Sequence, residues 1–149
     1  MDKNNDIVIG LLLGDETKGA TVSFLASENQ PKANLRFSGG CQAAHNVYHP
    51  KTGAHHTFAQ FGAATFYNVP TILSKYMMVE PYSLAKEGMA LIPKAGFDVF
   101  SKLIISKNSL ITTPIHKFIN RIKEMVESLG YKVDTKQQMC QLIKMHYDF

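Results

Sequence analysis

Apolar residues along the chain fall into short unbroken runs and longer stretches of helical spacing. The run Ile7–Leu13 has no polar alternation, which predicts a strand buried on both faces of a parallel sheet. Further strands are predicted at Asn34–Phe37, Tyr76–Val79 and Leu103–Ser106. Strands that alternate with helices favour a single α/β layer structure.

Four stretches between and after these runs predict helices. The first runs from Lys18 to Ser27, and the second begins at Pro81 and should bend or stop near Pro93. The clearest is Pro114–Leu129, where Thr113 is the expected N-cap. A further helix is predicted at Thr135–His146.

The segment from His45 to Pro70 has turn residues between two runs compatible with strands. It predicts a β-hairpin excursion from the sheet. The expected fold class is therefore α/β, with a mostly parallel sheet, flanking helices and one hairpin. Two loops that could form a functional site follow predicted strands. They lie at the strand ends where open α/β sheets bind ligands.

Composition agrees with a globular domain, because 45% of the 149 residues are hydrophobic and 19% are charged. The net charge of +4 favours small anionic ligands. It is too diffuse to indicate a nucleic-acid partner. No apolar run is long enough to span a membrane, no signal peptide is recognisable, and Cys41 and Cys140 are far apart, so a cytoplasmic location is expected.

The first candidate loop is Gly14-Asp-Glu-Thr-Lys-Gly19, which follows the first predicted strand. A strand that ends in such a loop and leads into a helix is typical of phosphate binding. The loop is not a Walker A motif, since Ala20 and Thr21 stand where a Lys-Ser/Thr pair would be needed. Its own acid, Asp15, indicates a role in catalysis or metal binding.

The second loop is Arg36-Phe-Ser-Gly-Gly-Cys-Gln-Ala-Ala-His-Asn-Val47. Together the two loops resemble the N-terminal part of adenylosuccinate synthetases, which read W-G-D-E-G-K-G-K and R-x-x-G-G-x-N-A-G-H-T. A shorter branch of that family is more similar, with G-G-x-Q-A-G-H-N and a stretch like His55–Ala63. The resemblance predicts a family domain at residues 1–130 and a tail at 131–149.

The resemblance implies a GTP-dependent ligase that joins IMP and L-aspartate in purine biosynthesis, with Mg²⁺ as cofactor. Asp15 would be the base, His45 the acid, and Asp15 with the backbone carbonyl of Ala44 the magnesium ligands. The implied GTP-binding residues are Gly14, Asp15, Glu16, Thr17, Lys18, Gly19, Ala20 and Asn46. The implied IMP-binding residues are Asp15, Glu16, Thr17, Lys18, Gln42, Ala43, Ala44 and His45.

Some positions depart from the family pattern. Thr17 and Ala44 replace glycines, and Ala20 replaces a lysine. The glycine-rich switch loop, the arginines for aspartate and the guanine-reading Lys-x-x-Asp of the family have no counterpart after the helix at Pro114. We therefore expect no synthetase activity from the 149 residues alone, and expect a homodimer or a complementing second chain.

Two other functions stay open from the sequence. The chain could be a module that binds a purine nucleotide without ligating it, or a protein that keeps only the fold for interactions. The histidines His49, His55 and His56 could suggest zinc, but no cysteine or carboxylate stands at ligand spacing nearby, so a hairpin surface is the better interpretation.

Overall fold

The computed structural model describes residues 5–11, 16–41 and 43–130. The chain divides into two compact units, Met1–Ile111 and Thr112–Phe149, which are considered separately. The predicted tail helix at 135–146 lies outside the described residues.

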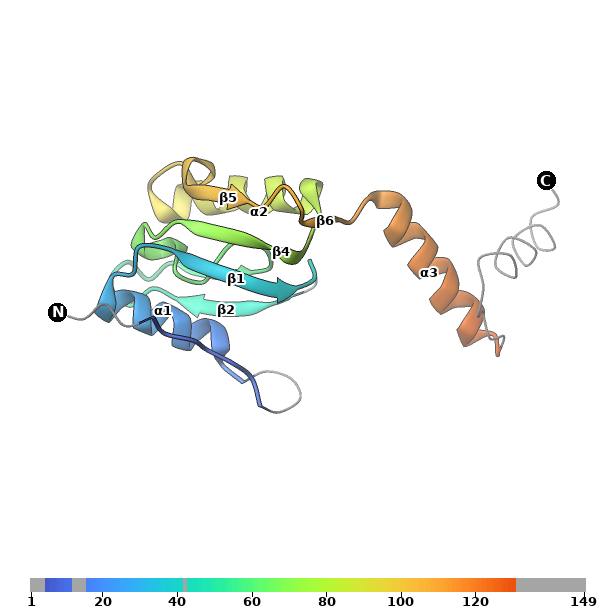
Figure 1. The fold of residues 1–149 in the computed structure, drawn as a ribbon, viewed down its shortest axis with the longest axis horizontal. Helices are drawn as coiled ribbons and strands as arrows, with labels where there is room; N and C mark the ends of the chain where they lie inside the picture. The colour runs from blue at the N-terminus through green and yellow to red at the C-terminus, as the bar shows by residue number, and fades with distance from the viewer. Residues whose placement is uncertain (1–4, 12–15, 42, 131–149) are drawn as a thin grey trace. The chain divides into compact units, whose positions relative to one another are not determined.

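A four-stranded parallel sheet is the centre of the first unit (Figure 1). Its long strand β4 (Thr71–Val79) pairs with β1 (Asn34–Gly39) along one edge. Along the other edge it pairs first with β5 (Leu103–Ile105) and then with β6 (Leu110–Ile111). The α/β class and the mostly parallel sheet predicted from sequence are confirmed.

The predicted hairpin is also confirmed, as a separate antiparallel pair of β2 (His45–Tyr48) and β3 (His55–Phe58). Helix α1 (Lys18–Asn29) packs beside β2. Two short 3₁₀ helices complete the unit, η1 (Thr65–Tyr67) and η2 (Val99–Lys102).

Helix α2 (Pro81–Ala95) begins directly after β4. The Glu80 carboxylate caps it by accepting hydrogen bonds from the backbone N–H groups of Tyr82 and Ser83. The helix ends two residues past Pro93, close to where the sequence predicts, and its C-cap residue Gly96 has φ 79°. That left-handed conformation suits glycine, so Gly96 sets the helix end.

The hydrophobic core lies on one face of the sheet. Alternate residues of β4, among them Leu73, Met77 and Val79, are fully buried there with Phe58 and Leu91. Successive side chains of β4 point to opposite faces of the sheet, so only half of its apolar residues belong to the core.

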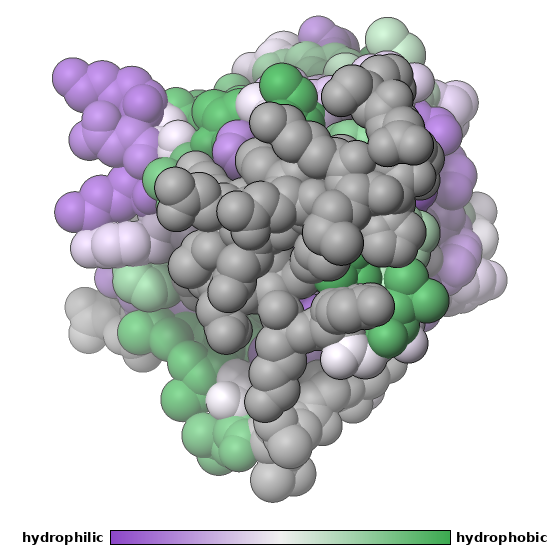
Figure 2. Space-filling view, turned by 90° about the vertical axis from the view of Figure 1, so that its right-hand side faces the viewer, coloured by the Kyte–Doolittle hydropathy of each residue, from purple (hydrophilic) through white to green (hydrophobic). Residues whose placement is uncertain are grey.

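The other face of the sheet, here called the outer face, is exposed. Its large side chains are Leu35, Phe37, Tyr76, Met78 and Ile104. The rings of Phe37 and Tyr76 are in contact, with centroids 5.1 Å apart. Figure 2, which views the molecule from another side, shows that apolar residues (green) reach the surface beside hydrophilic ones (purple) there too. Parallel sheets are normally covered on both faces. The exposed outer face is therefore unusual for an α/β fold.

The second unit contains helix α3 (Pro114–Ser128). Its start follows the prediction: the Thr113 hydroxyl accepts from the His116 N–H, and the His116 side chain accepts from the Thr113 N–H. No helix among the described residues is long and apolar enough to cross a membrane.

The strand predicted at Ile7–Leu13 is wrong for its described part. Residues 7–11 form no strand, and Ile7 and Leu11 are each 84% exposed. A strand needs a ladder partner, and among the described residues β1 pairs with β4 only. An apolar run in a sequence does not reveal whether such a partner exists. The strand β4 begins at Thr71, earlier than predicted, and β6 was not predicted at all.

Candidate functional site

The first motif leads into the N-terminus of α1. Thr17 is the N-cap residue, with φ 57° and ψ 19°, and its side chain makes no capping hydrogen bond to the helix. This is the left-handed region that favours glycine, so a threonine here is strained. The first turn of α1 carries no acidic residue. Its N–H groups and positive dipole end therefore suit an anion.

Glu16 and Lys18 form an ion pair at the same place. Lys18 Nζ lies 2.5 Å from Glu16 Oε2, and Glu16 Oε1 accepts a hydrogen bond of 2.8 Å from the Leu11 N–H. Glu16 thus ties the preceding segment to the start of α1. A phosphate that approaches Lys18 would compete with the Glu16 carboxylate for the ammonium group.

The second motif follows β1 and leads into β2. Gly39 has φ 123°, a value that only glycine adopts easily, and it allows the chain to leave the sheet. His45 is the first residue of β2 and pairs with Phe58 of β3. Next to it, the Asn46 Oδ1 accepts a hydrogen bond of 2.5 Å from the Thr57 hydroxyl.

The two motifs meet at Gly19 and His45. A Cβ built on Gly19 would lie 2.5 Å from the Cβ of His45 and 3.3 Å from its Cα. Gly19 is buried, and only a residue without a side chain allows α1 to approach β2 this closely. The structure thus brings Gly19 of the first motif against His45 of the second. Of the other described site residues, Glu16, Thr17, Lys18 and Ala20 adjoin Gly19 along the chain, and Ala43, Ala44 and Asn46 adjoin His45. The site residues Gly14, Asp15 and Gln42 lie outside the described residues.

Two half-buried residues of opposite charge, Arg36 and Glu87, hold the segment that follows the hairpin. The guanidinium Nη1 of Arg36 donates to the carbonyls of Ala59 and Phe61 at 2.6 and 3.1 Å. The Glu87 carboxylate accepts from the N–H groups of Ala59, Gln60 and Phe61 at 2.8–3.3 Å. Burial lowers the pKa of Arg36, and the nearby Glu87 opposes that shift.

Sequence reasoning missed Glu87. It lies in a helix, where a glutamate is usually a solvated surface charge, and no motif marks it. The turn that it holds begins immediately after Phe58, the pairing partner of His45. Arg36 and Glu87 therefore stabilise the strand pair that carries His45.

A known family model matches most of the chain. The adenylosuccinate synthetase family model matches residues 7–141. The chain belongs to the adenylosuccinate synthetase family. The match runs past Gly130, so the domain boundary expected at that residue stays a prediction.

Curated adenylosuccinate synthetases align over most of the chain. The synthetase of Thermotoga maritima is 32% identical over 127 residues, which cover 85% of this chain and 31% of the relative. Adenylosuccinate synthetase 2 of Pseudoalteromonas translucida is 31% identical over 128 residues, or 80% of this chain and 27% of the relative. The chain thus spans less than a third of the length of these relatives.

A solved structure has the same fold. The fully ligated adenylosuccinate synthetase from Plasmodium falciparum matches with a TM-score of 0.65 at 23% identity. The match covers 90% of this chain and 31% of that structure.

The described part of the site fits a magnesium ion bound mainly through a nucleotide. Mg²⁺ takes hard oxygen ligands, often one or two from the protein and the rest from phosphates and water. Ala44, an exposed residue next to His45, carries a backbone carbonyl oxygen of the kind that such an ion takes. Among the described residues no group of three His, Cys, Asp or Glu side chains could hold a metal by itself.

The histidines considered for zinc have other surroundings. The His49 Nδ1 accepts a 3.2 Å hydrogen bond from the Thr52 N–H, and its ring packs against Tyr67. His56 is buried, with Nε2 3.8 Å from the Glu87 carboxylate. These contacts agree with structural roles in the hairpin.

Proposed function

We propose that this chain is the nucleotide-binding portion of an adenylosuccinate synthetase, with GTP and IMP bound where α1 meets β2. The observation that carries the proposal is the direct packing of Gly19 against His45, which joins the two family motifs into one site. The relatives are named as synthetases, and the chain covers only part of their length.

The proposed roles follow the family motif. The loop Gly14–Ala20 would surround the GTP phosphates, with N–H groups at the start of α1 as donors and Lys18 as a cation. Asp15 would accept the proton from the IMP ring. His45 would donate a hydrogen bond to the oxygen that is phosphorylated. Glu16, Thr17, Gln42 and Ala43 would line the bound nucleotide, and Asn46 would contact GTP.

Magnesium is part of the proposal, with Asp15 and the Ala44 carbonyl as its protein ligands. A bound magnesium ion would neutralise negative charge on the transferred phosphoryl group. The chain's own residues then have to orient the nucleotides, since positioning accounts for much of the rate of such reactions.

We further propose that the 149 residues do not catalyse ligation alone. The L-aspartate and guanine determinants of the family have no counterpart in them, so a homodimer or a complementing second chain would be the partner. The exposed outer face of the sheet supports a partner. A reduced, cytoplasmic setting belongs to the same proposal.

The experiment is a pair of assays on the purified chain. Adenylosuccinate formation from IMP, GTP, aspartate and Mg²⁺ should be undetectable, whereas calorimetry should detect Mg²⁺-dependent binding of GTP at millimolar ligand. Asp15→Ala should abolish the magnesium dependence. Turnover that Asp15→Ala abolishes would show a complete enzyme, and absence of any nucleotide binding would leave only a structural role.

The second candidate is a binding module without ligase activity in any assembly. The strained Thr17 favours it, because a Cβ stands where the nucleotide must approach the backbone. Nucleotide binding that persists in a complex with a complementing chain, without turnover, would select this function.

A further inference from the structure

The imidazole of His56 lies where β3 meets α2. Its side chain is 10% exposed, and its Nε2 atom lies 3.8 Å from Oε1 of Glu87, whose side chain is 7% exposed. Among the buried side-chain nitrogen and oxygen atoms of the described residues, only His56 Nε2 has no hydrogen-bond partner. Buried polar atoms are nearly always hydrogen-bonded, so this one calls for a physical explanation.

The other ring nitrogen of His56 faces a lysine. Lys94 Nζ, near the end of α2, lies 3.5 Å from His56 Nδ1 and donates a 2.8 Å hydrogen bond to the His55 carbonyl. An ammonium group only donates, so Nδ1 is the acceptor and the proton of the neutral ring is assigned to Nε2. A hydrogen bond from this Nε2–H to a carboxylate would need about 2.7–2.9 Å, roughly 1 Å less than the observed separation.

The Glu87 carboxylate has capacity for one further donor. Its Oε1 accepts from the N–H groups of Ala59 and Phe61 at 2.9 and 3.3 Å, and its Oε2 accepts from Gln60 N–H at 2.8 Å. A carboxylate has about four acceptor sites, and these three bonds occupy three of them. A donor on the His56 ring therefore suits the remaining site.

The charges around the ring decide what a proton would do there. Helix α2 presents the negative Glu87 and the positive Lys94, and β1 contributes Arg36, which donates to backbone carbonyls beside Glu87. The Phe58 ring packs edge-on against the imidazole, with centroids 4.9 Å apart, and carries no charge. A protonated ring would be the third cation near one carboxylate. Lys94 is exposed and can move into water, so it is the cation that gives way.

We propose that His56 is a proton-controlled contact between the hairpin and α2. The neutral ring accepts from Lys94, which also holds the His55 carbonyl. A ring that takes a second proton from solvent, as imidazoles do between about pH 5 and 8, closes its Nε2–H on Glu87 and repels Lys94 from both contacts. The tie between the hairpin and the end of α2 is then exchanged for one at the turn after β3. This device goes beyond nucleotide binding and does not depend on it.

An NMR titration of the full chain from pH 8 to pH 5 tests the proposal. At pH 8 the ring nitrogens of His56 should show the Nε2–H tautomer. As the ring takes up its proton, three backbone amide signals should shift with the same midpoint: those of Ala59 and Phe61, which donate to Glu87, and that of His56, which follows the His55 carbonyl. An Nδ1–H tautomer at pH 8, or a ring that is protonated while these amides stay still, would overturn the proposal.

Substitutions of the two charged neighbours should move the midpoint in opposite directions. Lys94→Met removes the cation at Nδ1 and should shift it to higher pH, whereas Glu87→Gln removes the anion and should shift it to lower pH. Lys86→Met, at another exposed position of α2, should leave it unchanged. Lys94 is exposed, so the Lys94→Met result decides even where Glu87→Gln fails to fold. An unchanged midpoint in Lys94→Met would contradict the proposal.

Two further variants separate His56 from the histidine beside it. His55→Gln alters an exposed side chain and should leave the shared transition of the three amides in place. His56→Gln should abolish that transition. A transition that survives His56→Gln, or that disappears with His55→Gln, would assign it to another group and overturn the proposal.

Discussion

Gly19 of α1 and His45 of β2 pack without space for a methyl group between them. Each belongs to a different sequence motif, and the 25 intervening residues include the whole of β1. This contact brings the two loops together, because it fixes the start of α1 against the first residue of the hairpin.

Gly19→Ala should destabilise the protein by about 1–2 kcal/mol. The added Cβ would lie 2.5 Å from the Cβ of His45, and overpacking costs about 1–3 kcal/mol, more than the gain of up to about 1 kcal/mol from alanine in a helix. Urea unfolding measures the change. Glu28→Ala, at an exposed position of the same helix, should stay within about 0.5 kcal/mol of wild type. A neutral or stabilising Gly19→Ala would refute the close approach.

Thr17→Gly should raise stability by up to about 1 kcal/mol, because relief of the left-handed strain exceeds the entropy cost of glycine. Thermal unfolding would show it as a higher Tm. The same variant should also bind Mg²⁺–GTP more tightly, since a Cβ is removed from the loop. A lower Tm for Thr17→Gly would mean that Thr17 is not strained.

Glu87→Ala should destabilise by about 2–4 kcal/mol, since it leaves three N–H groups without an acceptor and removes the negative charge near the half-buried Arg36 guanidinium. The matched control is Glu127→Ala, which removes an exposed partner of Lys123 at 3.7 Å. That change should cost no more than about 0.5 kcal/mol. If both substitutions lower the free energy of unfolding in urea equally, the Glu87 contacts stabilise the protein no more than an exposed ion pair does.

Much of this fold could be predicted from the sequence, because helices and turns are encoded locally. Thr113 and Pro114 mark the start of α3, and the turn residues near Gly53 mark the hairpin. The apolar run at Ile7–Leu11 failed as a predictor, since strand pairing depends on a distant partner. The importance of Glu87 also depends on distant contacts, which no spacing in the sequence reveals.

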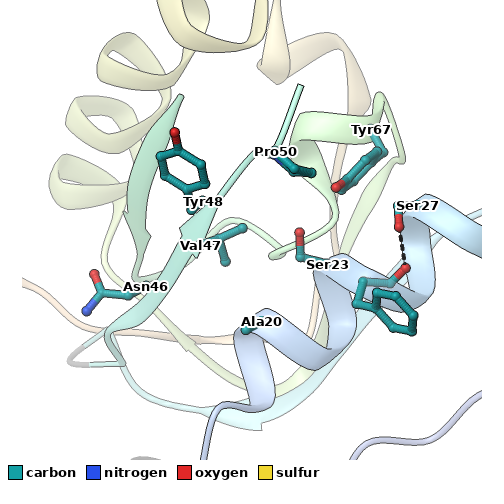
Figure 3. Close-up of a pocket in the computed structure, with 9 residues that line it drawn as sticks. Ala20, Ser23, Ser27, Asn46, Val47, Tyr48, Pro50 and Tyr67 are labelled. Carbon is teal, nitrogen blue, oxygen red and sulfur yellow. Dashed lines mark hydrogen bonds between the residues drawn. The ribbon is translucent and has the colours of Figure 1, made fainter. Parts of the chain in front are cut away.

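The site divides in the same way. The family motifs indicate His45 and Lys18 from the sequence alone. The ion pair of Lys18 with Glu16, and the left-handed backbone of Thr17, become visible only in three dimensions. A groove beside α1 (Figure 3) follows from the small side chains of Ala20, Ser23 and Ser27 facing a hairpin that lies far along the chain.

Phe37→Lys should reduce self-association of the chain while lowering its stability by no more than about 1.5 kcal/mol, because Phe37 is exposed on the outer face and loses its ring contact with Tyr76. Sedimentation velocity over a concentration series measures this. Tyr82→Lys, at an exposed position of α2, is the control and should not change association. A wild-type chain that stays monomeric at every concentration would exclude a homodimer through this face.

The most direct test of the central claim is a two-dimensional NMR titration of the chain with Mg²⁺–GTP. If the two motifs form one nucleotide site, the amide signals of Gly19 and His45 shift together along one saturation curve, and Asp15→Ala weakens both. Signals that saturate at different GTP concentrations, or a His45 signal that does not move while Gly19 does, would contradict the account.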